Sequence, residues 1–146
     1  MRRSAFALLF LTAASAHGAP NEDHWGSPPS VDYGRAAELV ASGRYDEALV
    51  ILVDLADKSP GDADVFNLLG FSYRKTGDLS RARKHYERAL RLDPDHLGAL
   101  EYQGELFLMQ GDAAGAKANL VRLEALCPSG CEEREELEEA IEAAGG

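Results

Sequence analysis

The chain has 146 residues, with 15 Lys and Arg against 25 Asp and Glu, which gives a formal net charge of −10. This length suits one domain. The acidic balance disfavours nucleic acid and anionic membranes as partners of the whole molecule, because both carry negative charge themselves.

The first 16 residues have the pattern of a secretory signal peptide. They begin with the basic stretch Met1-Arg2-Arg3, continue with an apolar run over residues 5–11 and end in small residues up to Ala16. This order is typical of an export signal, and the run is shorter than the about 20 residues that a membrane-spanning helix needs. We expect cleavage after Ala16 and a periplasmic protein without membrane insertion, or a secreted one if there is no outer membrane.

Residues 17–29 follow the signal and contain three Pro and two Gly without apolar periodicity. This composition predicts a flexible leader. After cleavage His17 would be the N-terminal residue, where its amine and imidazole could bind copper with help from His24. A leader without fixed geometry favours solvated histidines over a metal site.

The rest of the chain repeats with a period of 34 residues. The identical positions are Gly43, Gly77 and Gly111, then Ala48, Ala82 and Ala116, and then Pro60, Pro94 and Pro128. A fixed period of this length marks stacked supersecondary units, which present a shared surface rather than one catalytic pocket. Apolar residues recur at helical spacing, so each unit is predicted to be a helix, a turn, a second helix and another turn.

Turn residues divide each unit. The repeated glycines are predicted to end the first helix, because glycine tolerates the left-handed backbone found there, and the repeated prolines end the second. Asp78 and Asp112 are predicted to cap the second helices, and Asp62 and Asp95 the first helices of the following units. Seven helices result.

The middle unit shows the packing pattern most completely. Its apolar and small positions are Phe66, Leu69, Gly70 and Tyr73 on the first helix and Ala82, Tyr86 and Ala89 on the second. With Pro94, this pattern resembles the tetratricopeptide repeat family. The third unit matches less closely, and the first departs most, with Asp32 and Arg35 where aromatic residues are usual.

The resemblance covers about residues 29–128. It implies an all-α fold, namely a right-handed α-solenoid of three helix-turn-helix units with a C-terminal capping helix. The expected boundaries are a domain over 30–144, repeats at 29–62, 63–96 and 97–130, and a capping helix over 131–143. Leu137 and Ile141 fall on one stripe of that last helix and Glu residues elsewhere, as suits an element that ends the stack in water.

Cys127 and Cys131 are the two cysteines of the chain. In an exported protein we favour a structural disulfide, which would hold the capping helix to the third unit. Ser129 and Glu132 fit a capping box that would place Cys131 in the first helical turn. Redox activity of Cys131 and metal binding remain alternatives, although the following Glu residues oppose a thiolate and no further metal ligand is near in sequence.

The resemblance also implies a concave groove, lined by the first helix of each unit, that binds a peptide or helix of a partner protein. By position it would contain Tyr33 and Ala37, then Asn67, Phe71 and Arg74, and then Glu101, Glu105 and Leu108. Asn67 and Arg74 can bond to a peptide backbone or carboxylate, and Phe71 can stack on apolar side chains. The paired Lys and Asn with which the family clamps a C-terminal carboxylate are not reproduced.

Charge is concentrated in two further segments. A basic stripe on the outer helix of the second unit comprises Arg81, Arg83, Lys84, Arg88 and Arg91, and the tail over 132–142 holds seven Glu. We interpret both as solvated faces. The stripe is alternatively a docking surface for an acidic partner, such as the tail of another copy, which would give weak, salt-sensitive self-association.

No nucleophile elbow, phosphate-binding glycine loop or convergent acid pair is present, so we expect neither an enzyme nor a cofactor. The sequence favours an exported protein–protein interaction scaffold in the cell envelope. The alternative is a periplasmic accessory protein that handles metal or thiols through Cys127 and Cys131 or through His17.

Overall fold

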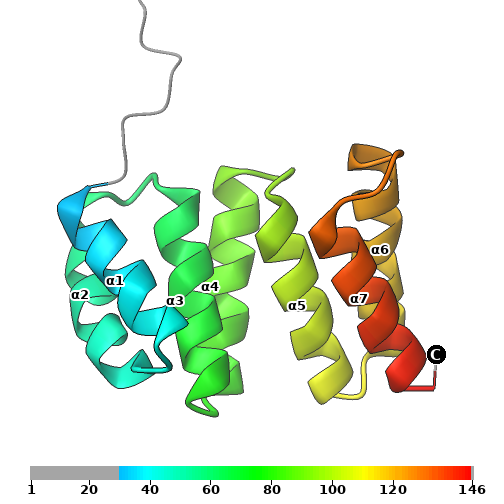
Figure 1. Ribbon diagram of the computed structural model, residues 1–146, viewed down its shortest axis with the longest axis horizontal. Helices are drawn as coiled ribbons and strands as arrows, with labels where there is room; N and C mark the ends of the chain where they lie inside the picture. The colour runs from blue at the N-terminus through cyan, green and yellow to red at the C-terminus, as the bar shows by residue number, and fades with distance from the viewer. Residues whose placement is uncertain (1–29, 146) are drawn as a thin grey trace, which may run out of the picture.

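The computed structural model describes residues 30–145, which form seven helices and no strand. The helices are α1 (Val31–Ala41), α2 (Tyr45–Lys58), α3 (Ala63–Lys75), α4 (Leu79–Leu92), α5 (Leu97–Met109), α6 (Ala113–Leu126) and α7 (Glu132–Ala143). They stack as three helix pairs with α7 at the C-terminal end (Figure 1). The predicted all-α fold is confirmed, while the predicted signal peptide and leader lie outside the described residues.

The 34-residue period is visible in the backbone of the turn inside each pair. Gly43, Gly77 and Gly111 have φ angles of 73°, 89° and 77°, the left-handed region that glycine enters without steric cost. The residue after each glycine donates its N–H to a carbonyl five residues earlier, at 2.8, 2.9 and 2.8 Å. These are Schellman-type helix ends, so the predicted role of the glycines is confirmed.

Three of the four predicted aspartate caps form, at Asp62, Asp78 and Asp112. The prediction of Asp95 as the cap of α5 is wrong, because His96 occupies that position. Its Nδ1 accepts the Ala99 N–H at 3.1 Å, which leaves the proton on Nε2, 2.9 Å from Asp64 Oδ1. His96 therefore joins the start of α5 to the start of α3.

The hydrophobic core runs along the array as three adjoining clusters. Their buried residues are Ala36, Ala48, Leu52, Leu55, Val65 and Leu69, then Ala82, Tyr86 and Leu106, and then Leu100, Ala116, Leu123, Leu137 and Ile141. The helices approach closely at two glycines. A Cβ atom on Gly70 would lie 2.6 Å from the Tyr86 ring, and one on Gly104 would lie 2.6 Å from Leu137. Both sites thus require glycine for the observed packing.

The last helix covers the C-terminal end of the array by packing on α5 and α6. The Cys127 and Cys131 sulfur atoms lie at disulfide-bonding distance, with 5.8 Å between the Cα atoms. The predicted capping box of Ser129 is wrong, since Cys131 is the N-cap residue and its side chain makes no capping bond. Cys131 has extended backbone, with φ −156° and ψ 160°, and so cannot belong to the first turn of α7.

Within residues 30–145, none of the helices is long enough and apolar enough to span a lipid bilayer.

Candidate functional site

One face of the array is built from α1, α3 and α5, the first helices of the three pairs. These helices and α7 contact one another in chain order. Tyr33 lies on α1, Asn67, Phe71 and Arg74 lie on α3, and Glu101 and Glu105 lie on α5. The fold thus places all six predicted groove residues on consecutive helices of one layer.

The middle of this layer holds a cluster that joins α3 to α5. Arg74 is only 8% exposed, and its Nη2 lies 2.5 Å from Glu105 Oε2. Its guanidinium carbon is 5.3 Å from the centre of the Phe71 ring and 5.6 Å from that of Tyr102. The two rings are 4.8 Å apart. An ion pair and two cation–π contacts therefore hold the guanidinium. We name Phe71, Arg74, Tyr102 and Glu105 the central cluster.

Two further side chains extend the central cluster around Phe71. The Tyr45 ring, from the start of α2, lies 6.2 Å from the Phe71 ring in an edge-on arrangement. Lys75 Nζ lies 5.1 Å from the Phe71 ring centre. Phe71 remains half-buried, so the cluster keeps an accessible aromatic surface with positive charge beside it.

Two buried polar atoms on α3 have no hydrogen-bond partner among the described residues. They are Arg74 Nε, a donor, and Asn67 Oδ1, an acceptor. The two residues are seven positions apart, which is two helical turns and about 10 Å along one face of the helix. Leaving such a buried atom unpaired costs about 1–3 kcal/mol. Both atoms are enclosed by the protein itself in this conformation.

Glu101 differs from the other predicted groove residues because α7 covers it. Its side chain is 2% exposed. Burial raises the pKa of Glu101 to about 9, and a hydrogen bond with Glu136 and the negative charges of Glu136, Glu105 and Glu133 contribute to the rise. The carboxyl group is therefore neutral at pH 7. It offers a partner little surface and belongs to the contact between α5 and α7.

Tyr33 and Asn67 lie closer to the amino ends of α1 and α3 than the central cluster does. Tyr33 is half-buried, and burial with the nearby Asp64 and Asp62 raises its pKa to about 12. The Asn67 amide nitrogen would be 3.3 Å from a Cβ atom on Gly98, so it faces the start of α5. The contacts bring Phe71, Arg74 and Glu105 together but do not join Tyr33 or Asn67 to them.

Sequence reasoning missed Tyr102 and Lys75, and it did not place Tyr45 or Glu136 at this site. Tyr102 precedes Glu105 by one helical turn, so the i, i+3 spacing on α5 offered a signal for it. No signal pointed to Glu136, because its position depends on how α7 docks against α5.

The outer side of the middle pair carries a second aromatic and cationic arrangement. His85 stacks on Tyr73 at 5.3 Å and on Phe66 at 6.1 Å. The guanidinium carbon of Arg81 lies 5.3 Å from the Tyr73 ring centre, and that of Arg88 lies 5.5 Å from the Phe66 ring centre. The result is a stack of three rings, with one guanidinium over Tyr73 and another over Phe66. Burial, with the charges of Arg81 and Lys84, lowers the pKa of His85.

Arginines of the outer helices also join neighbouring units. Arg88 donates to the Pro60 carbonyl at 2.8 Å, and Arg122, one period later, donates to the Pro94 carbonyl. Arg83 bonds to Gln110 and lies over a ring of α5. The interpretation of the basic stripe as simply solvated is therefore wrong for Arg83 and Arg88, because both are half-buried and bridge helices.

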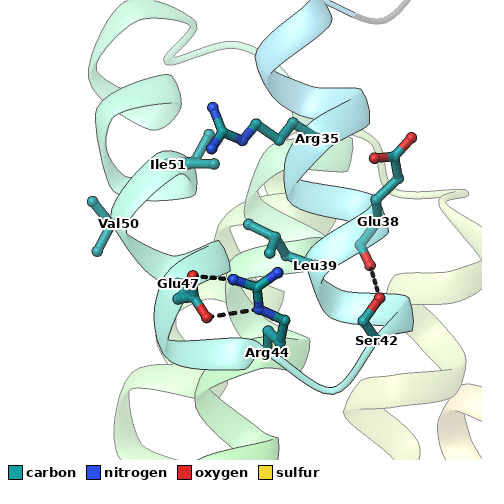
Figure 2. Close-up of a pocket in the computed structure, with 8 residues that line it drawn as sticks. All are labelled: Arg35, Glu38, Leu39, Ser42, Arg44, Glu47, Val50 and Ile51. Carbon is teal, nitrogen blue, oxygen red and sulfur yellow. Dashed lines mark hydrogen bonds and ion pairs between the residues drawn. The ribbon is translucent and has the colours of Figure 1, made fainter.

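A separate concave site lies between α1 and α2 at the N-terminal end of the array (Figure 2). It encloses about 490 Å³ and is lined by Arg35, Glu38, Leu39, Ser42, Arg44, Glu47, Val50 and Ile51. Arg44 binds Glu47 through Nε at 2.7 Å and Nη2 at 2.5 Å. We name this site the end pocket; it contains none of the predicted groove residues.

Over residues 30–145, the structure shows no group of three or more His, Cys, Asp or Glu side chains placed to hold a metal ion. His17 and His24, the candidate copper ligands, lie outside the described residues.

Residues 63–96, the α3–α4 pair, match the model of the family described as Tetratricopeptide repeat. The chain is 35% identical over 81 residues to a "Probable biofilm formation methyltransferase WspC" of Pseudomonas putida, covering 56% of this chain and 19% of that protein. It is 33% identical over 95 residues to "Cellulose synthase 2 operon protein C" of Komagataeibacter xylinus, covering 65% of this chain and 7% of that protein. The chain therefore spans less than a fifth of either relative.

Solved structures show the same architecture at lower identity. The first TPR domain of Spaghetti (RPAP3), bound to an HSP90 peptide, has a TM-score of 0.69 at 20% identity, covering 80% of this chain and 92% of that one. The type III secretion translocator chaperone SycD of Yersinia enterocolitica has a TM-score of 0.70 at 22% identity, covering 78% and 81%. With the repeat match and the seven helices, these likenesses show that the chain has the all-α tetratricopeptide repeat fold.

Proposed function

We propose that this TPR-type interaction module is exported and binds a segment of a partner protein in the groove formed by α1, α3 and α5, within the cell envelope. The observation that carries the proposal is the central cluster, where the half-buried Phe71 ring lies beside Tyr45 and Tyr102 with the exposed Lys75 next to it.

The partner's side chains would meet aromatic surface at this site. Phe71, Tyr102 and Tyr45 form a connected set of rings, and aromatic residues in partly enclosed positions contribute strongly to binding. The Arg74 charge is already offset by Glu105. The groove therefore selects for apolar side chains, and less for a partner carboxylate than Arg74 alone would suggest.

Two kinds of observation support this proposal. Among the solved neighbours, the TPR domain of Spaghetti is bound to an HSP90 peptide, and SycD is in complex with a peptide of the translocator YopD. Export rests on the signal pattern of residues 1–16. Periplasmic fractionation and N-terminal sequencing test this part separately; an intact Met1 terminus on cytoplasmic protein would refute export while leaving the groove untouched.

A second candidate is a thiol-handling protein that keeps Cys127 and Cys131 as reactive thiols, whereas the structure places their sulfur atoms at disulfide-bonding distance. Thiol counting on protein purified without reductant decides this point. Two reactive thiols would favour the alternative, and none would favour the interaction module.

Groove binding is tested by recovering the partner from native envelopes with tagged chain after cross-linking. Phe71→Ala removes a ring of the central cluster, and Lys75→Glu reverses a charge beside it. Lys84→Glu is the matched control, because Lys84 is a lysine of the same repeat unit but lies on α4. We expect about tenfold or greater loss of partner with the groove variants and none with the control. Unchanged recovery with Phe71→Ala, at unchanged helical content, would exclude this groove.

A further inference from the structure

Few buried side chains hold the last helix to the array. Among the helices of the described chain, α7 packs only on α5 and α6, and its buried side chains are Leu137 and Ile141. It has 12 residues, seven of them Glu, and an isolated helix of this length is marginal in water. Its last turn holds Glu142 and no basic residue, although the helix dipole favours cations there. The helical state of α7 therefore depends on its docking.

Docking of α7 buries a carboxyl group that is better solvated in water. Glu101 of α5 is 2% exposed beneath α7. The charged groups that act on it are Glu136 and Glu133 of α7 and Glu105 of α5, all of the same sign. The docked carboxyl must therefore hold a proton at pH 7, whereas the carboxyl of a released α5 surface ionises in water. This difference opposes docking and offsets part of the packing of the two apolar side chains.

The disulfide joins the end of α6 to the start of α7. Cys127 is the C-cap residue of α6 and Cys131 is the N-cap residue of α7, four positions later. Arg134, in the first turn of α7, also donates to the Cys127 carbonyl at 3.4 Å. Closing this short loop lowers the conformational entropy of the released state, so the bond should favour docking by about thirtyfold in the equilibrium constant.

The disulfide is open to exchange. Both cysteines are half-buried, and residues 128–130 between them are exposed. Exchange begins when a thiolate reaches one of the two sulfur atoms. A dithiol of another protein can therefore reduce this bond while the chain is folded.

We propose that the disulfide is a switch, and that its reduction by a protein dithiol releases α7 from α5 and α6 while the three helix pairs stay folded. A thiolate of the dithiol attacks one sulfur atom, forms a mixed disulfide and displaces the other sulfur as a thiolate, which takes a proton from water. The second thiolate of the dithiol then attacks the mixed disulfide. The chain gains two electrons and two protons, and the dithiol is oxidised to a disulfide.

The helix pairs keep cores of their own when α7 leaves. The first two clusters of the hydrophobic core contain no residue of α7. In the third cluster, Leu100, Ala116 and Leu123 belong to α5 and α6. Release of α7 is therefore a local event at the C-terminal end of the array.

Release of α7 would also change the groove. Glu101 and Glu105 lie about one helical turn apart on α5, so release returns Glu101 to solvent as a second carboxylate on this helix. The reduced chain then presents a more negative groove than the oxidised chain does. This consequence rests on the proposed groove function, whereas the switch itself does not.

The test is hydrogen exchange of the full chain, measured by mass spectrometry before and after treatment with dithiothreitol in native buffer. We expect amide exchange over residues 132–143 to become about thirtyfold faster on reduction, and exchange in α1 to α4 to stay unchanged. Glu101→Gln removes the ionisation, so it should slow the exchange of α7 in the reduced chain. Glu138→Gln is the matched control without this effect, because Glu138 is exposed on α7.

A variant with both Cys127→Ser and Cys131→Ser lacks the bond without any reductant, and it should exchange like the reduced chain. Exchange in α7 that reduction leaves unchanged, or a disulfide that dithiothreitol reduces only in denaturant, would overturn the proposal. Equally faster exchange in α1 to α6 would overturn it as well, because the bond would then stabilise the whole fold. The measurement needs no partner, so a failure of the groove function leaves it intact.

Discussion

The buried carboxyl of Glu101 makes the stability of this fold depend on pH. In the folded chain its pKa is raised to about 9, from a reference value of 4.5. A folded-state pKa above the unfolded one means that the folded state binds the proton more tightly. The contribution of Glu101 to the free energy of unfolding is therefore fully present below about pH 4.5, and it is lost as the pH rises through about 9.

The size of the effect follows from the pH range between the two pKa values. From pH 4.5 to pH 7 the free energy of unfolding falls by about 1.4 kcal/mol per pH unit, so the loss at pH 7 is about 3 kcal/mol. Glu101→Gln keeps the shape and the hydrogen-bonding capacity of the side chain but removes its ionisation. We expect this variant to match the wild-type chain near pH 4 and to exceed its free energy of unfolding by up to about 3 kcal/mol at pH 7.

The assay is urea unfolding followed by circular dichroism, at intervals from about pH 4 to about pH 9, the range over which this carboxyl changes state. Glu138→Gln serves as the control, because Glu138 is exposed on the same α7 helix that covers Glu101. With rising pH, the free energy of unfolding of the wild-type chain should fall relative to that of Glu101→Gln. It should run parallel to that of the Glu138→Gln control. Parallel curves for all three proteins, or a less stable Glu101→Gln at pH 7, would refute the reasoning.

Three further predictions concern packing and cross-links. Gly104→Ala should lower stability by about 1–3 kcal/mol, because its Cβ atom would lie 2.6 Å from Leu137. Gly34→Ala has open space around its Cβ atom and should raise stability by about 0.5–1 kcal/mol. Melting temperatures that shift in the same direction for both variants would contradict this. Arg88→Ala should cost about 1–2 kcal/mol through its lost bond to the preceding unit, so an unchanged urea midpoint would count against that bridge. Cys127→Ser should cost about 2 kcal/mol, as expected for a short closed loop; no response of wild-type protein to reductant would contradict it.

The fold could be predicted because each unit carries its own local signals. The glycine that ends a first helix and the aspartate that caps the second, as at Gly77 and Asp78, act within a few residues of one another. The cap of α5 was missed because it is not local. Asp95 is the better cap by residue type, but His96 is held in place by Asp64, 32 residues away.

The candidate site was predictable only in part, for the same reason. Register along the repeat placed Phe71, Arg74 and Glu105 on the first helices of two neighbouring units, α3 and α5. It did not indicate that Arg74 would be buried against Glu105, because that contact depends on how α3 and α5 approach. It also did not indicate that α7 would cover Glu101, because that position depends on how Leu137 of α7 packs against Gly104 of α5.

The central claim is that a partner segment lies in the groove of α1, α3 and α5. It is tested most directly by placing a photo-cross-linking amino acid at Lys75, beside the central cluster, and in a parallel sample at Lys84 on α4. After irradiation of native envelopes, the account predicts an adduct with one partner from position 75 and none from position 84. An adduct of that partner from position 84 alone would contradict it.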